Sequence, residues 1–263
     1  MKKKICSIII CVMGALWMTA CASDLAAKET SLENTAESAD GGTEAEQTDA
    51  ESPEQDVETI ETEETEILQF VDVFGQQYET VISNAVAKHS YDWSNLTSDG
   101  RYVSYEDDVY TSRVGIDVSY HQGEIDWQKV KDDGITFAFI RIGYRGYGER
   151  GLLCEDTKAL EYIEEASQAG IDVGVYFFSQ AINEEEALEE AEFVINQLQG
   201  IELQLPVVYD PESILDDEAR TDDVSGEQFT KNTVVFCERI REAGYEPMIY
   251  SNMLWEAFEF DLE

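Results

Sequence analysis

One strand–helix unit is written out in residues 172–199, DVGVYFFSQAINEEEALEEAEFVINQLQ. Its first seven residues form a short apolar run rich in valine and aromatic side chains, which predicts a strand buried on both faces. Asn183 then stands at the N-cap of a helix, and the three glutamates after it fall at the positive end of that helix. The segment therefore predicts a β-strand followed directly by an α-helix.

The same order of elements continues on both sides of this unit. Apolar runs at 114–119, 137–142, 205–210 and 247–251 predict four more strands, and 126–131, 155–169, 225–243 and 253–260 predict the helices that follow. The dipeptide Ala-Gly ends two of the helices, at 169–170 and 243–244. Five β/α units in succession indicate an α/β fold with a parallel central sheet.

The charge of the chain is strongly negative. Its 263 residues include 57 acidic and 17 basic side chains, which gives a formal net charge of −40. Such a balance excludes a basic surface for nucleic acid and argues against electrostatic adhesion to anionic lipid. We therefore expect no nucleic-acid partner.

Residues 1–20 have the pattern of a bacterial export signal. Three lysines at 2–4 precede an apolar stretch at 5–18 that is too short to span a bilayer comfortably. The tripeptide Thr19-Ala20-Cys21 resembles a lipobox, in which Cys21 would carry a lipid and anchor the protein to the outer face of the cell membrane. A plain signal peptide with a chance cysteine is the alternative.

Three further segments follow the signal. Residues 21–66 are mainly Glu, Asp, Thr, Ser and Ala, which predicts a disordered acidic linker, either a spacer or solubilising filler. Apolar residues at helical spacing over 67–89 predict a helix that opens a lead-in segment, 67–112. The α/β domain would occupy 113–263.

Candidate catalytic side chains are carboxylates at the ends of predicted strands, where parallel barrels place their sites. Asp210 and Glu212 are two residues apart on a strand, so they share a face with Cα atoms about 6.6 Å apart. Two carboxyl groups in a partly dry cleft do not ionise equally, and such a pair performs glycosidic bond cleavage. Asp117 lies inside an apolar strand run, where burial is costly without hydrogen bonds; it could serve catalysis or satisfy loop amides.

Six other side chains near strand ends are candidates for substrate binding: Arg141, Tyr144, Tyr176, Phe178, Tyr250 and Asn252. Flat aromatic rings suit the C–H faces of sugars, although packing explains such rings equally well. No metal site is expected, because the two histidines, His89 and His121, lack ligand spacing. Cys154 and Cys237, both expected on helices, could form a disulfide after export or stay reduced.

Several of these motifs together resemble one known family. The run GIDVSYHQG at 115–123, followed by IDW at 125–127, resembles the opening motif of glycoside hydrolase family 25, the Chalaropsis-type lysozymes. The runs FAFIR at 137–141, GVYFF at 174–178, PVVYDPE at 206–212 and YSN at 250–252 resemble its next four strands in order.

The resemblance implies a flattened, TIM-like β/α barrel in which three further strands close the five β/α units. It implies an N-acetylmuramidase that cleaves the β-1,4 bond between N-acetylmuramic acid and N-acetylglucosamine in peptidoglycan, without a cofactor. Glu212 would be the general acid, Asp210 would assist it, and Asp117 would lie on the cleft floor.

The resemblance also shapes three further expectations. No run matches the three closing strands, so we expect the domain at 113–263 to be incomplete and inactive alone. We expect a monomer. The alternative function is a non-catalytic lipoprotein that binds cell-wall glycan on the same fold.

Overall fold

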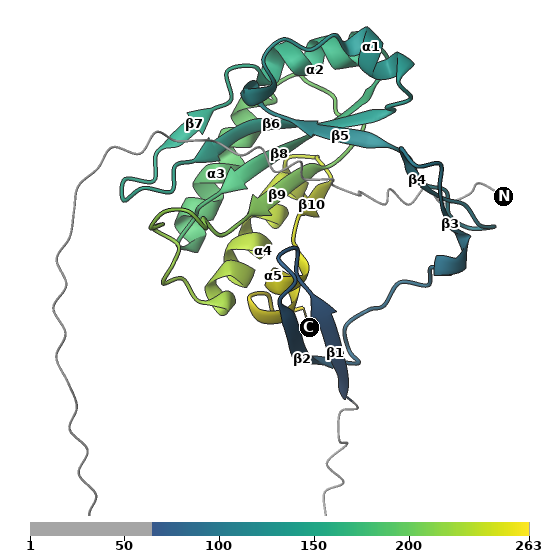
Figure 1. Ribbon diagram of the computed structural model, residues 1–263. Coiled ribbons are helices and arrows are strands. Elements are labelled where there is room, and N and C mark those ends of the chain that lie inside the picture. The colour runs from purple at the N-terminus through teal and green to yellow at the C-terminus, as the bar shows by residue number, and fades with distance from the viewer. Residues whose placement is uncertain (1–64, 263) are drawn as a thin grey trace, which may run out of the picture. The chain divides into compact units, whose positions relative to one another are not determined.

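The computed structural model describes residues 65–262, and its main feature is a mixed sheet that is mostly parallel (Figure 1). Five parallel strands run in the order β10-β9-β8-β6-β5, and β7 pairs antiparallel with the end of β6. The strands are β5 (Gly115–Val118), β6 (Phe137–Arg145), β7 (Leu153–Glu155), β8 (Asp172–Ser179), β9 (Val207–Pro211) and β10 (Pro247–Ile249). The predicted α/β fold is confirmed. In the described part of the chain the sheet is open, with β5 and β10 at its edges.

Helices follow the parallel strands where the sequence predicts them. They are α1 (Trp127–Asp132), α2 (Ala159–Gln168), α3 (Glu184–Gln197), α4 (Gly226–Glu242) and α5 (Met253–Phe258). The Asn183 side chain accepts the backbone N–H of Glu186 at 2.9 Å, so the predicted N-cap is formed. Gly170 and Gly244, with φ of 73° and 93°, end the turns after α2 and α4, as the Ala-Gly dipeptides indicate.

The two faces of the sheet differ in what covers them. On one face, strand residues such as Ile140, Val175 and Phe177 pack with α1 to α4 in a single large apolar cluster. The opposite face carries a much smaller cluster, formed by Phe137, Phe139 and Val208 with partly buried neighbours. The helices therefore occupy one side of the sheet and leave the other for the site.

The helix predicted over 67–89 is wrong. This segment forms an antiparallel hairpin of β1 (Thr65–Val71) and β2 (Gln77–Ser83), in which Phe70 pairs with Tyr78. The Asp72 carboxylate accepts the backbone N–H groups of Phe74 and Gln76, each at 2.9 Å, and this turn overrides the helical spacing of the apolar residues. The rings of Phe70 and Tyr78 then pack against Phe258 of α5, at centroid distances of 6.4 and 6.0 Å.

Smaller elements complete the described chain. They are the 3-10 turns η1 (Trp93–Asn95) and η2 (Tyr120–Gln122) and the short hairpin of β3 (Leu96–Ser98) and β4 (Val103–Tyr105). Strand β7 was not expected, and it carries Cys154, which therefore lies on a strand and not on a helix. Cys154 and Cys237 are both free thiols.

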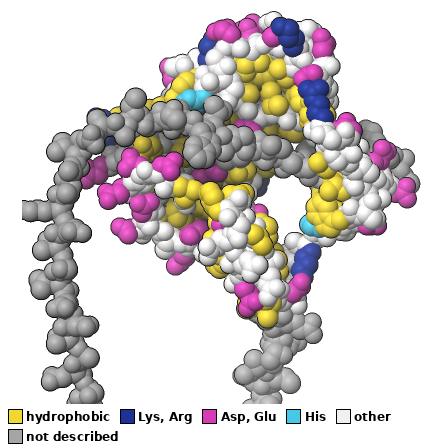
Figure 2. All heavy atoms as spheres, viewed as in Figure 1, with side chains coloured by type: hydrophobic (Ala, Val, Ile, Leu, Met, Phe, Trp, Pro, Cys, Tyr) yellow, Lys and Arg dark blue, Asp and Glu magenta, His cyan; other side chains and the backbone are white. Residues whose placement is uncertain are grey.

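Within residues 65–262, no helix has both the length and the apolar character needed to cross a membrane. The predicted signal, Cys21 and nearly all of the acidic linker lie outside the described residues. Acidic side chains are spread over the face shown in Figure 2, where basic ones are few.

Candidate active site

Strand register brings most of the predicted site residues onto one face of the sheet. Parallel pairing sets Arg141 of β6 beside Tyr176 of β8, and Phe178 of β8 beside Asp210 of β9. Asp117 of β5 pairs with the residue two before Arg141 and so shares its face, because strand side chains alternate. These five side chains therefore line the face that the helices leave uncovered.

Glu212 and Tyr250 extend this group beyond the ends of β9 and β10. The backbone N–H of Tyr250 donates to the Tyr209 carbonyl at 2.9 Å, which continues the parallel pairing past β10. A side-chain hydrogen bond joins Tyr250 to the carboxyl group of Glu212. The predicted pair Asp210 and Glu212 thus stands beside a tyrosine of the neighbouring strand.

Asp210 is the buried member of the carboxyl pair. Its exposed fraction is 7%, and among the residues that the structure describes none makes a hydrogen bond to its buried Oδ1 atom. Burial raises the pKa of Asp210 well above its usual value, the charges of Glu212 and Asp117 raise it further, and Arg141 opposes the rise. Asp210 therefore holds a proton at a pH where an ordinary aspartate is ionised.

Glu212 is half-buried and responds to the same surroundings. Burial is the largest cause that raises its pKa, and the charge of Asp117 adds to it. The hydrogen bond from Tyr250 acts in the opposite direction, because it stabilises the carboxylate. The balance leaves Glu212 with a raised pKa, which is the property that a general acid needs near neutral pH.

Asp117 departs from the expectation of burial, since its side chain is exposed at the edge strand β5. The run around it is apolar because Val118 faces the helix side of the sheet, where it is 5% exposed. Asp117 nevertheless lies close enough to Asp210 and Glu212 to raise the pKa of each. The three predicted carboxylates therefore lie close enough to one another for their charges to interact.

Arg141 is held by a carboxylate that the sequence analysis missed. Its Nε donates to Asp156 Oδ2 at 2.9 Å, and the Asp156 side chain is fully buried. The Arg141 guanidinium carbon also lies 5.2 Å from the ring centroid of Tyr120 and 5.0 Å from that of Tyr144. Asp156 follows strand β7, which the sequence analysis did not predict. In so acidic a sequence, no motif distinguished Asp156 from the many other carboxylates as a partner of Arg141.

The position of Tyr144 depends on an irregularity in β6. The pairing with β8 shifts between Arg141 and Gly143, so that Tyr144 pairs with Phe178. Without this bulge, a residue three positions after Arg141 would face the opposite side of the sheet. The bulge therefore turns Tyr144 toward the site.

Asn252 has a structural part in α5. Its Oδ1 accepts the backbone N–H groups of Leu254 and Trp255, at 3.0 and 3.2 Å. The helix cap therefore uses the side-chain oxygen of Asn252. Contact between its side-chain NH₂ group and substrate stays a prediction.

The fold and the site define an α/β domain whose open sheet face carries three interacting carboxylates beside aromatic rings and an arginine. The model of the glycosyl hydrolases family 25 matches residues 116–260, which is more than half of the chain. The protein belongs to this family, and the resemblance seen in the motifs is confirmed.

Related proteins show the extent of the similarity. The chain is 25% identical over 137 residues to the autolytic lysozyme of Clostridium acetobutylicum, a match that covers 52% of this chain and 37% of that protein. The modular autolysin LytC of Streptococcus pneumoniae is 23% identical with a TM-score of 0.48, over 73% of this chain and 44% of that one. The lysozyme of Streptomyces coelicolor is 26% identical with a TM-score of 0.46, over 55% and 65% of the two chains. The chain thus spans less than half the length of the first two relatives.

Proposed function

We propose that this protein is a peptidoglycan hydrolase, an N-acetylmuramidase that cleaves the β-1,4 bond between N-acetylmuramic acid and N-acetylglucosamine. The observation that carries the proposal is the buried carboxyl group of Asp210 beside Glu212 and Asp117 on the open face of the sheet. Membership of family 25 supports the same reaction class.

Glu212 is the general acid in this proposal. Its raised pKa keeps the carboxyl group protonated at a pH where ordinary glutamates are ionised, so it donates a proton to the glycosidic oxygen as the bond breaks. The 2-acetamido oxygen of the substrate attacks the anomeric carbon from the other side, and water then opens the resulting ring. Asp210 orients the acetamido group through Oδ1, to which none of the described residues makes a hydrogen bond, and Asp117 acts from the exposed edge of the same sheet face.

The neighbouring side chains bind the glycan. Tyr176, Phe178 and Tyr144 offer ring surfaces to the sugar faces, and Tyr250 fixes the Glu212 carboxyl group. Arg141 is held from below by Asp156 and offers its remaining N–H groups to substrate oxygens.

The proposal also includes the location of the enzyme. Cys21 carries a lipid, and the acidic linker separates the domain from the outer face of the cell membrane. The substrate is then the glycan strand of the adjacent wall.

The test is Glu212→Gln, which keeps the size of the side chain and removes the proton that it donates. We expect a loss of about 10²- to 10⁴-fold in the release of reducing ends from purified peptidoglycan, and a strong loss for Asp210→Asn. Glu184→Gln, at an exposed glutamate of the α3 N-terminus, is the matched control. Release at the wild-type rate by Glu212→Gln would refute the assignment.

The assay uses the 263-residue chain and a fusion that adds the closing strands of a family relative. This pair of proteins tests the expectation of an incomplete domain at the same time. Pull-down of the protein by purified walls, with no reducing ends released by either form, would support the glycan-binding alternative.

A further inference from the structure

The turn after β8 carries a buried amide that reaches the loop of the carboxyl pair. Gln180 is 1% exposed, and its Nε2 donates to the backbone carbonyl of Glu212 at 2.7 Å. Its Oε1 accepts the hydroxyl of Thr221 at 2.9 Å. Glu212 directly follows β9 and Thr221 lies shortly before α4, so a single side chain fastens both ends of the loop between these elements.

The orientation of this amide is dictated by the Glu212 carbonyl. A backbone carbonyl can only accept, so the NH₂ group must face Glu212, and the Thr221 hydroxyl then donates to the amide oxygen. A rotation of the amide by half a turn would set its oxygen against the Glu212 carbonyl oxygen and break that bond, whereas the Thr221 hydroxyl could still accept from the NH₂ group. Gln180 therefore holds the loop in one arrangement.

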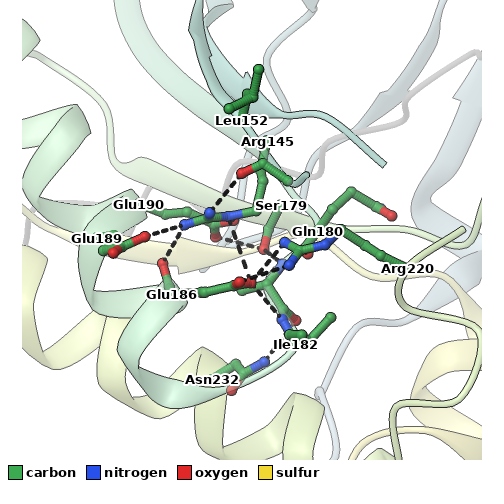
Figure 3. A network of polar contacts seen from close by, with 12 residues as sticks. Arg145, Leu152, Ser179, Gln180, Ile182, Glu186, Glu189, Glu190, Arg220 and Asn232 are labelled. Carbon is green, nitrogen blue, oxygen red and sulfur yellow. Dashed lines mark hydrogen bonds and ion pairs between the residues drawn. The ribbon is translucent and has the colours of Figure 1, made fainter. Parts of the chain in front are cut away.

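The backbone of Gln180 is itself fixed from two sides (Figure 3). Its carbonyl accepts Arg220 Nη1 at 3.2 Å, and its N–H donates to the carboxylate of Glu190. Arg220 in turn forms a two-fold ion pair with Glu186, at 2.7 Å for each bond. The backbone that carries the amide is thus held in place by a network of charged groups.

This network of charged groups continues on the helix-covered side of the sheet. Glu190 is fully buried and accepts Arg145 Nε at 2.8 Å and the Ser179 hydroxyl at 2.6 Å. Ser179 is also hydrogen-bonded to the Tyr209 hydroxyl at 2.8 Å, directly before Asp210. The network therefore connects α3 and the end of β8 to the end of β9.

We infer that Gln180 is a positioning residue for the reaction, which fixes the backbone of Glu212 so that its carboxyl group points along the site face. This inference rests on the proposed function of Glu212 as general acid. The middle of the same loop is exposed, with Leu215 at 76%, so packing of the loop centre contributes little to holding Glu212 in place. A displacement of about 1 Å at a reacting group can cost about 10²-fold in rate.

The test replaces Gln180 by methionine, which fills a similar volume and forms neither hydrogen bond. The first measurement is the pKa of the Glu212 carboxyl group by NMR titration of the full chain. Burial is the largest cause that raises this pKa, so a released Glu212 should titrate at lower pH, nearer to the ordinary value of a glutamate. Thr221→Val, which removes only the partner of Oε1, should produce a smaller change in the same direction.

Asn232→Leu is the matched control. Asn232 is also a fully buried amide; it donates to the Ala181 carbonyl at 2.9 Å and accepts Gln228 Nε2 of α4 at 2.8 Å, and both partners lie outside the loop. This variant should lose stability but leave the pKa of Glu212 unchanged. If Gln180→Met does not fold, Thr221→Val decides the question by the same titration.

The second measurement is hydrolysis by whichever form of the protein is active. Gln180→Met should lower kcat by about 10- to 100-fold with KM within about threefold, and the alkaline limb of the pH profile should move to lower pH. A pKa of Glu212 that is unchanged in both Gln180→Met and Thr221→Val overturns the inference. If Gln180→Met lowers the pKa of Glu212 while neither the wild-type chain nor its fusion hydrolyses peptidoglycan, the inference about geometry is supported and the proposed function is refuted.

Discussion

Replacement of Glu190 by glutamine should remove a pH dependence from the stability of the domain. The side chain of Glu190, a residue of α3, is fully buried against the end of β8. Burial raises its pKa from the usual 4.5 to about 7, although Ser179 and Arg145 stabilise the carboxylate. The folded protein therefore keeps a proton on Glu190 at a pH where the unfolded chain has lost it.

The sign and size of the effect follow from this difference. Between pH 4.5 and about 7 the folded state binds more protons at Glu190 than the unfolded state, so the free energy of unfolding falls as pH rises. Each unit of pKa is worth about 1.4 kcal/mol, so the rise corresponds to about 3 kcal/mol. This stability is present below pH 4.5 and is lost above about pH 7.

Urea unfolding followed by circular dichroism between pH 4.5 and 8 measures the effect. The stability of wild type minus that of Glu190→Gln should fall by about 3 kcal/mol across this range, because other titrating groups cancel in the difference. Glu189→Gln is the control, since this half-exposed carboxylate binds the same Arg145 guanidinium at 3.1 Å and should change stability by less than about 1 kcal/mol. A difference for Glu190→Gln that is flat, or that rises with pH, refutes the reasoning.

Three other expectations concern different parts of the chain. Asp117→Asn removes a negative charge that raises the pKa of Asp210, so NMR titration should find that pKa lower; an unchanged value would contradict the placement of the two groups. Gly174→Ala places a methyl group 2.5 Å from the ring of Phe139, and thermal unfolding should show a loss of about 1 to 3 kcal/mol, whereas a wild-type melting curve would argue against this close approach. Cys21→Ser should move the protein from the membrane pellet to the soluble fraction, and retention in the pellet with unchanged mobility would exclude a lipid on Cys21.

Local patterns in the sequence were sufficient for the α/β part of the fold. Apolar runs identified the five parallel strands, because strands covered by helices on one face and partly buried on the other carry few polar residues. The cap at Asn183 and the glycine after α2 identified helix ends, because these signals act on their own backbone neighbours. The same reasoning failed at 67–89, where the Asp72 turn and a contact with Phe258 outweigh helical spacing.

The site was only partly readable in advance. Asp210 and Glu212 could be paired from the sequence, because residues two apart on a strand share a face. The sequence by itself also determined the order of the β/α units and the family motifs that they carry. These features depend on residues that are close together in the chain, so the type and the spacing of the side chains are enough to predict them.

Only the tertiary structure decided how the segments act on one another. The shift in β6 turns Tyr144 toward Phe178, and strand β7 brings Asp156 to Arg141. Gln180 meets the Glu212 carbonyl across 32 residues of sequence. Contacts between residues so far apart in the chain leave no periodic signal, because they arise from the packing of whole elements and from the burial that follows it.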